Sequence, residues 1–414
     1  MERRILHVDF NGFYASVECM LNPDLAKFPL AVAGDPQKRH GIILAKNEAA
    51  KRCGVKTAEP IWQARQKCPK LITVAPHFDE YVRISERARE ILDGYSMRVE
   101  PFGLDESWVD LTARTNNFQE AEQLANEIRI IIKRELKITV SVGVSFNKVF
   151  AKLGSDMKKP DAVTVIAPWN YKRLVWPLPA SDLLFVGRAT ERKLERLGIT
   201  TIGGIAQSRP EVLVSKLGKW GLKLHAFANG RDDAPVLYSG TKIPPKSVGN
   251  GVTTPFDLCN DEQVRLTLSM LCESVAARLR EQGLRACTIS IAVRDVGLFS
   301  FVRQKKLSEP SCLAGELLDA AMELFIKNYR WQIPVRSISV TASDFWDGSR
   351  PVQLELMTPE ERRMRKERLE FAVDGIRARF GHHSILRCGL LRDRRIGDMN
   401  PKAEHTIFPV GYRT

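Results

Sequence analysis

Residues 99–110 of the chain read Val99-Glu100-Pro101-Phe102-Gly103-Leu104-Asp105-Glu106-Ser107-Trp108-Val109-Asp110. Two short apolar runs flank an adjacent pair of carboxylates, which predicts a β-hairpin with Asp105 and Glu106 at its turn. A third carboxylate, Asp9, ends an apolar run at the N-terminus. Three acidic side chains on strands are what a pair of divalent cations needs, because hard cations prefer oxygen ligands. Two such cations could hold the attacking and the leaving oxygen of a phosphoryl transfer.

The composition limits the classes of protein to which the chain can belong. With 414 residues it should form roughly two to four domains. Its net charge of +14 indicates a polyanionic partner, with nucleic acid the first candidate and an anionic membrane the second. No apolar run reaches the roughly 20 residues of a membrane span, and we find no signal peptide, so we expect a cytosolic protein without a membrane partner. The eight cysteines form no Cys-x-x-Cys pair and indicate reduced thiols, not a zinc site.

The pattern of apolar residues divides the chain into segments of different character. The first 165 residues alternate strands and helices, which predicts an α+β layer carrying the acidic hairpin. Short helices punctuated by glycine follow at 170–230, and then a proline-bearing linker. Residues 246–345 predict the order βαββαβ of a split-βαβ domain. The last 70 or so residues hold a basic amphipathic helix, with apolar Leu369, Val373, Ile376 and Phe380, and an irregular tail.

Four motifs carry a resemblance to a known family. The segments 7–18 (HVDFNGFYASVE), 103–107 (GLDES), 141–152 (SVGVSFNKVFAK) and 156–160 (DMKKP) resemble the signatures of the Y-family DNA polymerases. The resemblance runs from residue 4 to about 345 and is closest to the bacterial polymerase IV branch. It implies a template-directed DNA polymerase of low fidelity, acting in translesion synthesis on primer-template DNA with deoxynucleoside triphosphates, and working as a monomer in the bacterial cytosol near the nucleoid.

The same resemblance implies a right-hand architecture with four domains and a tail. Residues 1–10 and 77–165 would form the palm, 11–76 small fingers, and 166–233 a helical thumb that meets the DNA minor groove. The linker would be 234–243 and the βαββαβ little finger 244–345. Residues 346–414 would be a C-terminal tail.

The resemblance also assigns roles at the acidic site. Asp9, Asp105 and Glu106 would be catalytic and would ligate two Mg²⁺ ions, with the carbonyl of Phe10 as a further ligand and Mn²⁺ as a substitute metal. These are the hard oxygen ligands that Mg²⁺ takes. Asn11 stands where many members of the family have aspartate, at a position that is not a metal ligand, so catalysis should survive.

Four residues are expected to contact the incoming nucleotide. Phe13, Tyr14, Lys51 and Lys159 match nucleotide-binding positions of the family. Tyr14 would exclude a ribose 2′-hydroxyl by a clash with its ring; ignoring the motif, it could equally be a core aromatic residue. Lys51 replaces an arginine and offers a point charge without a bidentate fork, while Glu48 replaces a tyrosine and cannot bind phosphate favourably.

The remaining predicted contacts concern DNA and a protein ring. Residues 185–194 resemble a helix-hairpin-helix, in which backbone N–H groups at a helix start meet phosphates; Phe185 replaces the usual first glycine, and an ordinary αα-turn is the alternative. The predicted DNA contacts are Gly187, Arg188 and Thr190 in this hairpin and Lys246, Arg294, Arg303, Lys305 and Lys306 in the little finger. The predicted sliding-clamp peptide has the key residues Gln353, Leu354, Leu356 and Met357.

Two other readings of the sequence remain open at this point. A nucleotide cyclase-like phosphotransferase would share the two-metal logic but would not need the thumb hairpin or the basic distal domain. A catalytically dead DNA-binding relative would not need Asp9, Asp105 and Glu106 intact. Primer extension with and without Mg²⁺ would separate these readings.

Overall fold

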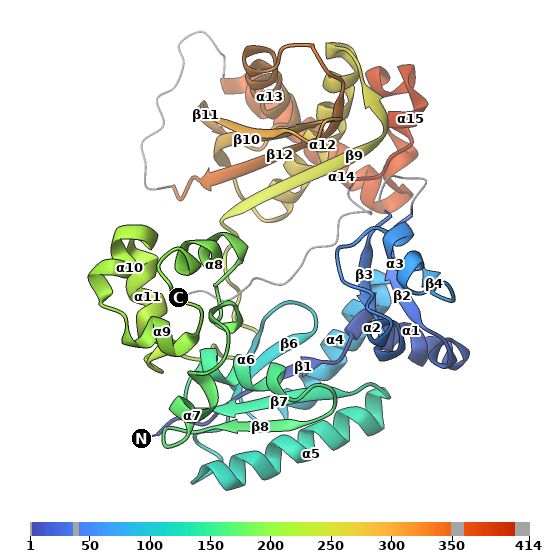
Figure 1. The fold of residues 1–414 in the computed structure, drawn as a ribbon. Helices are drawn as coiled ribbons and strands as arrows, with labels where there is room; N and C mark the ends of the chain where they lie inside the picture. The colour runs from blue at the N-terminus through green and yellow to red at the C-terminus, as the bar shows by residue number, and fades with distance from the viewer. Residues whose placement is uncertain (1, 36–40, 349–359, 402–414) are drawn as a thin grey trace. The chain divides into compact units, whose positions relative to one another are not determined.

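The computed structural model describes residues 2–35, 41–348 and 360–401. It divides into two compact units (Figure 1), of which the first contains residues 2–34 and 42–243 and the second begins at Pro244. Each unit has a sheet and a hydrophobic core of its own. No helix among the described residues is both long and apolar enough to cross a membrane.

A five-stranded sheet lies at the centre of the first unit. Its order is β5-β6-β1-β7-β8, and only β7 and β8 run parallel. The strands are β1 (Ile5–Phe10), β5 (Val99–Pro101), β6 (Glu106–Asp110), β7 (Val140–Ser145) and β8 (Val163–Ile166). The predicted hairpin is therefore present as β5 and β6, and it pairs antiparallel with β1.

Helices cover the two faces of this sheet differently. One face packs on α4 (Phe78–Asp93) and α5 (Phe118–Leu136), whose apolar sides form a core with Leu6 and Val8 of β1. The opposite face meets α6 (Lys148–Met157), and side chains alternate along a strand, so His7 and Asp9 point to the α6 side. This second face is the one that carries the acidic residues.

A smaller sheet follows β1 in the chain. Its order is β3-β2-β4, from β2 (Leu30–Ala33), β3 (Ile43–Lys46) and β4 (Ile72–Val74). The helices of this region are α1 (Phe13–Leu21), η1 (Pro23–Lys27), α2 (Glu48–Arg52) and α3 (Ile61–Lys67). Strands β4 and β8 are short, and each pairs parallel with a strand that is not its neighbour in a hairpin, so local periodicity cannot show them.

Short helices form the last part of the first unit, as the glycine pattern predicted. They are α7 (Tyr171–Val175), η2 (Ala180–Asp182), α8 (Arg188–Glu195), α9 (Ile202–Gln207), α10 (Pro210–Leu217) and α11 (Lys219–Ala228). Gly221 lies against the α10 backbone, where an added Cβ would stand 2.5 Å from the carbonyl carbon of Leu213, so only glycine fits this helix contact.

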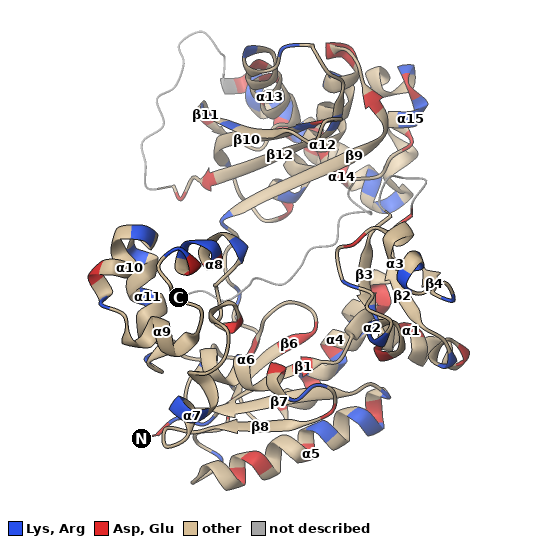
Figure 2. Cartoon of the chain, viewed as in Figure 1, with Lys and Arg blue, Asp and Glu red and all other residues tan. Residues whose placement is uncertain are grey.

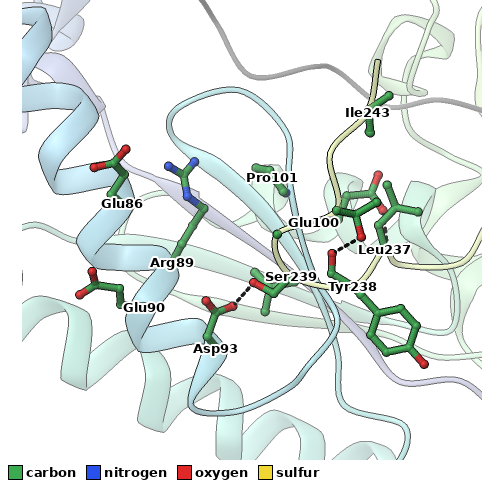
Figure 3. A pocket seen from close by; sticks show the side chains of 13 residues that line it. Glu86, Arg89, Glu90, Asp93, Glu100, Pro101, Leu237, Tyr238, Ser239 and Ile243 are labelled. Atoms are coloured by element: carbon green, nitrogen blue, oxygen red, sulfur yellow. Dashed lines mark hydrogen bonds between the residues drawn. The ribbon is translucent and has the colours of Figure 1, made fainter. Parts of the chain in front are cut away.

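Residues 232–241, which we call the strap, run along the sheet of the first unit and are not a free linker. The N–H of Leu237 donates to Glu100 at 3.0 Å, and the hydroxyl of Ser239 donates to Asp93 at 2.7 Å (Figure 3). Glu100 also accepts two hydrogen bonds of 2.7 Å from the buried ammonium of Lys148. The strap, α4 and β5 together line a pocket of about 510 Å³.

The second unit has the predicted order βαββαβ. Its elements are β9 (Ser247–Leu258), α12 (Asp261–Glu281), β10 (Ala286–Asp295), β11 (Ser300–Ser311), α13 (Ala314–Asn328) and β12 (Val335–Phe345). The antiparallel sheet has the order β11-β10-β12-β9. Helices α12 and α13 pack on one face and share its hydrophobic core.

The segment after residue 360 is more ordered than the sequence indicated. We expected an irregular tail after one helix, but α14 (Glu360–Phe380), η3 (His382–Ser384), η4 (Cys388–Arg392) and α15 (Arg394–Gly397) follow in turn. Leu390 and Ile396 are buried in the core of the second unit, and Asn250 donates to the carbonyl of Pro401 at 2.8 Å. Two isolated apolar residues complete a core contributed by other elements, so no periodic pattern could indicate them.

Candidate active site

The pairing of β1 with β6 brings two of the predicted carboxylates together. Asp9 and Glu106 are direct partners across the two antiparallel strands. The N–H of Phe10 donates to the carbonyl of Asp105 at 3.0 Å, which fixes the hairpin turn against the end of β1. Gly103 has a φ of +88°, a backbone conformation that favours glycine and lets the hairpin turn just before the acidic pair.

The three carboxylates titrate differently because their neighbours differ. Burial and the nearby charge of Glu106 raise the pKa of Asp9 to about 7, although Lys159 acts against both. The same two causes raise the pKa of Asp105 to about 6. Burial would also raise the pKa of Glu106, but His7 and Lys152 beside it lower that pKa to about 2. The site therefore holds negative charges close together where water screens them poorly.

Two lysines neutralise part of this charge. The Lys159 ammonium lies 2.8 Å from the Asp9 carboxylate and 2.8 Å from that of Asp156, and Lys152 of α6 forms an ion pair with Glu106. Each of Asp9 and Glu106 thus already pairs with a lysine ammonium group. Carboxylate oxygens are also hard ligands, so the donor set fits divalent cations of the Mg²⁺ type.

The sequence analysis missed the roles of two residues at this site, Lys152 and His7. His7 is fully buried; its Nδ1 lies 2.9 Å from Ser155 Oγ and its Nε2 3.3 Å from Glu106 Oε2. Candidate ligand atoms of His7, Asp9 and Glu106 all lie within 4.8 Å of one another, a group that does not include Asp105. The available signal for His7 was its position two residues before Asp9, on the same face of the strand.

An aromatic cluster surrounds the predicted nucleotide site. The ring of Tyr14 stacks on Tyr81 with centroids 4.3 Å apart and planes 11° apart, and Phe78 meets its edge. Burial, and then the charge of Asp105, raise the pKa of Tyr14 to about 12. Phe13 lies in the core with 3% of its surface exposed, so only its backbone could face a nucleotide. The half-buried Tyr14 is therefore a rigid ring that reaches towards the acidic site.

The two predicted phosphate-binding lysines have different surroundings. Lys159 is in the acidic site itself, where burial opposes its charge but Asp9 and Asp156 raise its pKa. Lys51 is exposed on α2 and lies 3.4 Å from Glu48, the residue that departs from the family pattern. The structure thus brings Lys159, and not Lys51, to the carboxylates.

The predicted hairpin of the helical segment includes a residue with a left-handed backbone conformation. Phe185 has a φ of +71°, the left-handed conformation that glycine would adopt at this position. Its ring contacts Trp220 and Phe227, with centroids 5.6 and 6.3 Å away. Gly187 precedes α8, which begins at Arg188 and carries both basic and acidic side chains in Figure 2. Packing of the Phe185 ring therefore helps to hold a backbone conformation that glycine adopts without strain.

The strand register of the second unit separates the predicted DNA contacts into two groups. Arg294 pairs with Ser300, and alternate residues Val302, Gln304 and Lys306 of β11 lie on the face that no described helix covers. Arg303 and Lys305 alternate with these and face the helices, because Lys305 forms an ion pair with Glu323 of α13 and Arg303 bonds Asn328.

The uncovered face, which we call the open face, is built of small uncharged residues. Its inner positions on β9, β10 and β12 are Gly249, Gly251, Thr253, Thr288, Ser290, Ala292, Ser337, Ser339, Thr341 and Ser343. Arg294 and Lys306 stand at its rim, and these positions include no acid. Lys246 is exposed directly before β9. The predicted clamp peptide at 353–357 lies outside the described residues.

Comparison with known proteins gives consistent results over nearly the whole chain. Residues 8–156 match the impB/mucB/samB family, and residues 245–356 match the C-terminal domain of that family. The chain is 47% identical to DNA polymerase IV of Acetivibrio thermocellus, over 95% of this chain and 99% of that one. It is 34% identical to DNA polymerase IV 2 of Bacillus subtilis, over 94% and 95% of the two chains.

A solved structure agrees with these sequence matches. The Y-family DNA polymerase chimera Dbh-Dpo4(243-245)-Dbh superposes with a TM-score of 0.73 and 26% identity, covering 82% of this chain and 98% of the other. The fold and the acidic site thus define a DNA-directed DNA polymerase of the Y-family, the class that the motifs indicated. The chain belongs to the impB/mucB/samB family and to its DNA polymerase IV group. It is a translesion polymerase that uses divalent metal, primer-template DNA and nucleotides.

Proposed function

We propose that Asp9, Asp105 and Glu106 hold two Mg²⁺ ions, with the Phe10 carbonyl as a further ligand, and that Mn²⁺ can replace them. The pairing of Asp9 with Glu106 across β1 and β6, next to Asp105, is the observation that carries this assignment. Bound metal would lower the pKa of the primer 3′-hydroxyl and stabilise the charge on the leaving pyrophosphate.

Lys159 has a second task in this proposal, because it now pairs with Asp9. Once a triphosphate enters, its ammonium can exchange the carboxylate for a phosphate oxygen without losing a negative partner. Lys152 and His7 hold Glu106 in its ionised form from the α6 side. Lys152 and Lys159 therefore offset part of the negative charge of the carboxylates until the substrate binds.

Tyr14 acts on the sugar of the nucleotide. Its ring is stacked on Tyr81 and cannot swing aside without losing that contact. A 2′-hydroxyl on the incoming sugar would meet this ring, whereas a deoxyribose would not. The side chain thereby selects deoxynucleotides by repulsion.

Loss of chemistry without loss of DNA binding tests the metal assignment. Asp105→Asn and Glu106→Gln should each lower primer extension in Mg²⁺ by at least about a thousandfold, because charge stabilisation at a transition state is worth several kcal/mol. The affinity for primer-template, measured by fluorescence anisotropy, should change less than about twofold. The matched control is Glu90→Gln, an exposed α4 residue paired with Arg87. Near-normal extension by both site variants would refute the assignment.

DNA would be held by two further surfaces. We propose that the N–H groups at the start of α8, with Gly187, Arg188 and Thr190, meet phosphates of the duplex. The open face would lie along the backbone, with Arg294, Lys306 and Lys246 as cationic contacts. Small neutral side chains there leave room for the close approach of the phosphates. These contacts read no sequence and suit an enzyme that must work at any lesion.

A clamp would supply the processivity that such contacts lack. We propose that Gln353, Leu354, Leu356 and Met357 dock on a sliding clamp, that the polymerase is a monomer, and that it works at the bacterial nucleoid. Tethering raises the effective concentration of the primer end. Replacing Leu356 and Met357 together by alanine should leave unassisted extension unchanged and abolish stimulation by the clamp; full stimulation would place the docking site elsewhere.

A further inference from the structure

Helix α14 is attached to the second unit by charged side chains. Its inward residues Arg363, Glu367, Glu370, Asp374 and Arg377 recur every three or four positions and so lie on one side of the helix. They form ion pairs or charge-assisted hydrogen bonds with the side chains of Glu309, Arg285, Arg280 and Glu273. Arg280, which bonds both Glu370 and Asp374, is 8% exposed, so this polar contact is well sheltered from water.

Four apolar residues of α14 lie on another side, where three of them are exposed and Val373 is partly buried. Leu369, Val373, Ile376 and Phe380 follow the spacing i, i+4, i+7, i+11, and we call them the Leu369 stripe. Leu369 is 64%, Ile376 38% and Phe380 65% exposed. The sequence pattern would normally turn such a stripe towards the core. Here the charged side makes the internal contact, and none of the four stripe residues belongs to the hydrophobic core of the described part of the second unit.

Cationic side chains continue the stripe at its N-terminal end. Arg362, Arg365 and Lys366 occupy the preceding turns of the same side, and Arg379 stands beside its C-terminal end. All four are exposed and form no ion pair with a described residue. The surface therefore combines an apolar seam with uncompensated positive charge at both ends.

The charge and the width of the surface limit what can cover it. A second copy of the chain would bring these cations together in either helix orientation, which disfavours self-association. The stripe covers an arc of only about 60° at 100° per residue, narrower than the apolar face of a helix lying in a membrane surface. DNA phosphates would satisfy the cations but not the apolar side chains. An amphipathic helix with acidic flanks satisfies both.

We propose that the Leu369 stripe is a docking surface for a protein partner that presents an amphipathic helix with apolar seam residues and acidic flanks. The two helices would pack side by side through knobs-into-holes contacts, with the partner's carboxylates against Arg362, Arg365 and Lys366. This function is separate from catalysis and does not depend on the metal assignment. It would recruit or regulate the polymerase through a helix fixed to the second unit by Arg280.

A pair of synthetic peptides tests the surface. The probe is a fluorescein-labelled four-heptad peptide with leucine at both seam positions and glutamate at both flanking positions; its counterpart has lysine for glutamate. Binding to the full chain is measured by anisotropy in 0.15 M salt. The variant Leu369→Ser/Phe380→Ser removes two exposed side chains of the stripe, and Ile130→Ser, on the exposed side of α5, is the matched control.

The acidic peptide should bind the parent and Ile130→Ser equally and the double variant at least about tenfold more weakly. Arg362→Glu/Arg365→Glu should reverse the preference between the two peptides, a result that a folding defect could not produce. Equal binding of the acidic peptide to parent and double variant would overturn the proposal. So would stripe-dependent binding to vesicles with 30% anionic lipid or to duplex DNA in place of the peptide. Unassisted primer extension should be the same in all variants.

Discussion

The sheets of the two units share a layered arrangement but differ in the surface that their second face presents. Each has one face packed on long helices and a second face on which we propose a functional surface. In the first unit that second face gathers Asp9 and Glu106, which are buried or partly buried, with Lys152 and Lys159 beside them. In the second unit it presents small neutral residues on three strands, β9, β10 and β12, along a face that α12 and α13 do not cover. Chemistry needs a few fixed charged atoms, whereas a grip on DNA needs many weak and replaceable contacts.

Ion pairs show the same contrast and give the prediction with the largest effect. Lys148 and Glu100 of the first unit are 1% and 7% exposed, whereas Lys305 and Glu323 of the second are 33% and 60% exposed. Lys148→Met should destabilise the fold by about 3–5 kcal/mol, because it leaves the buried Glu100 carboxylate without its counter-charge. Lys305→Met should cost less than about 1 kcal/mol. Urea unfolding of both variants measures this difference, and similar losses would contradict the contrast.

The next prediction concerns the rigid ring beside the buried site. Tyr14→Ala should raise ribonucleotide incorporation about a hundredfold or more, since a clash worth a few kcal/mol is removed. Single-nucleotide insertion with matched ribo- and deoxynucleotides gives the ratio. Tyr14→Phe keeps the ring and should retain the parent's selectivity. If the alanine variant discriminates as the parent does, Tyr14 is a core residue and not a gate.

Protonation of the carboxylates in the first unit should make metal binding depend on pH. Because the pKa of Asp9 is raised to about 7 and that of Asp105 to about 6, a divalent cation must displace protons below pH 7. Mn²⁺ affinity measured by titration calorimetry should therefore fall about tenfold from pH 7 to pH 6. Without metal, the folding stability has the opposite pH dependence to the metal affinity. Because the pKa values of Asp9 and Asp105 are higher in the folded than in the unfolded protein, they stabilise the fold at low pH, and this contribution is lost as the pH rises through 7. A metal affinity independent of pH would contradict these pKa values.

The smallest effects should appear on the open face. Arg294→Ala should weaken primer-template binding about two- to threefold and reduce the salt slope by about one. Arg303→Ala, on the same sheet but facing the helices, should change neither quantity. Anisotropy titrations at several salt concentrations compare the two variants. Equal losses would mean that strand register does not decide which arginine meets DNA.

Local periodicity predicted most of the fold, because the long helices and strands each bury one regular face. It could not predict the face of α14, since Arg280 and Arg285, which hold the helix by its charged side, lie about 90 residues earlier. Nor could it assign His7 or Lys152, whose roles depend on α6 crossing the β1–β6 pair. The side of the sheet on which Arg303 and Lys305 lie could, by contrast, have been predicted from the sequence. Phe301 and Leu307 pack against the core, and this alternation along β11 already indicated the side on which both cations lie.

The strap has a consequence for how the chain can be cut by proteases. Its residues 232–241 are held by hydrogen bonds to α4, β5 and the loop between them, so a protease cannot readily draw them into its extended active-site conformation. The exposed residues Lys242 and Lys246 lie just beyond it and before β9. Brief trypsin digestion should therefore separate the two units after these lysines and spare the bond after Arg231. The first fragment should keep the entire strap at its new C-terminus.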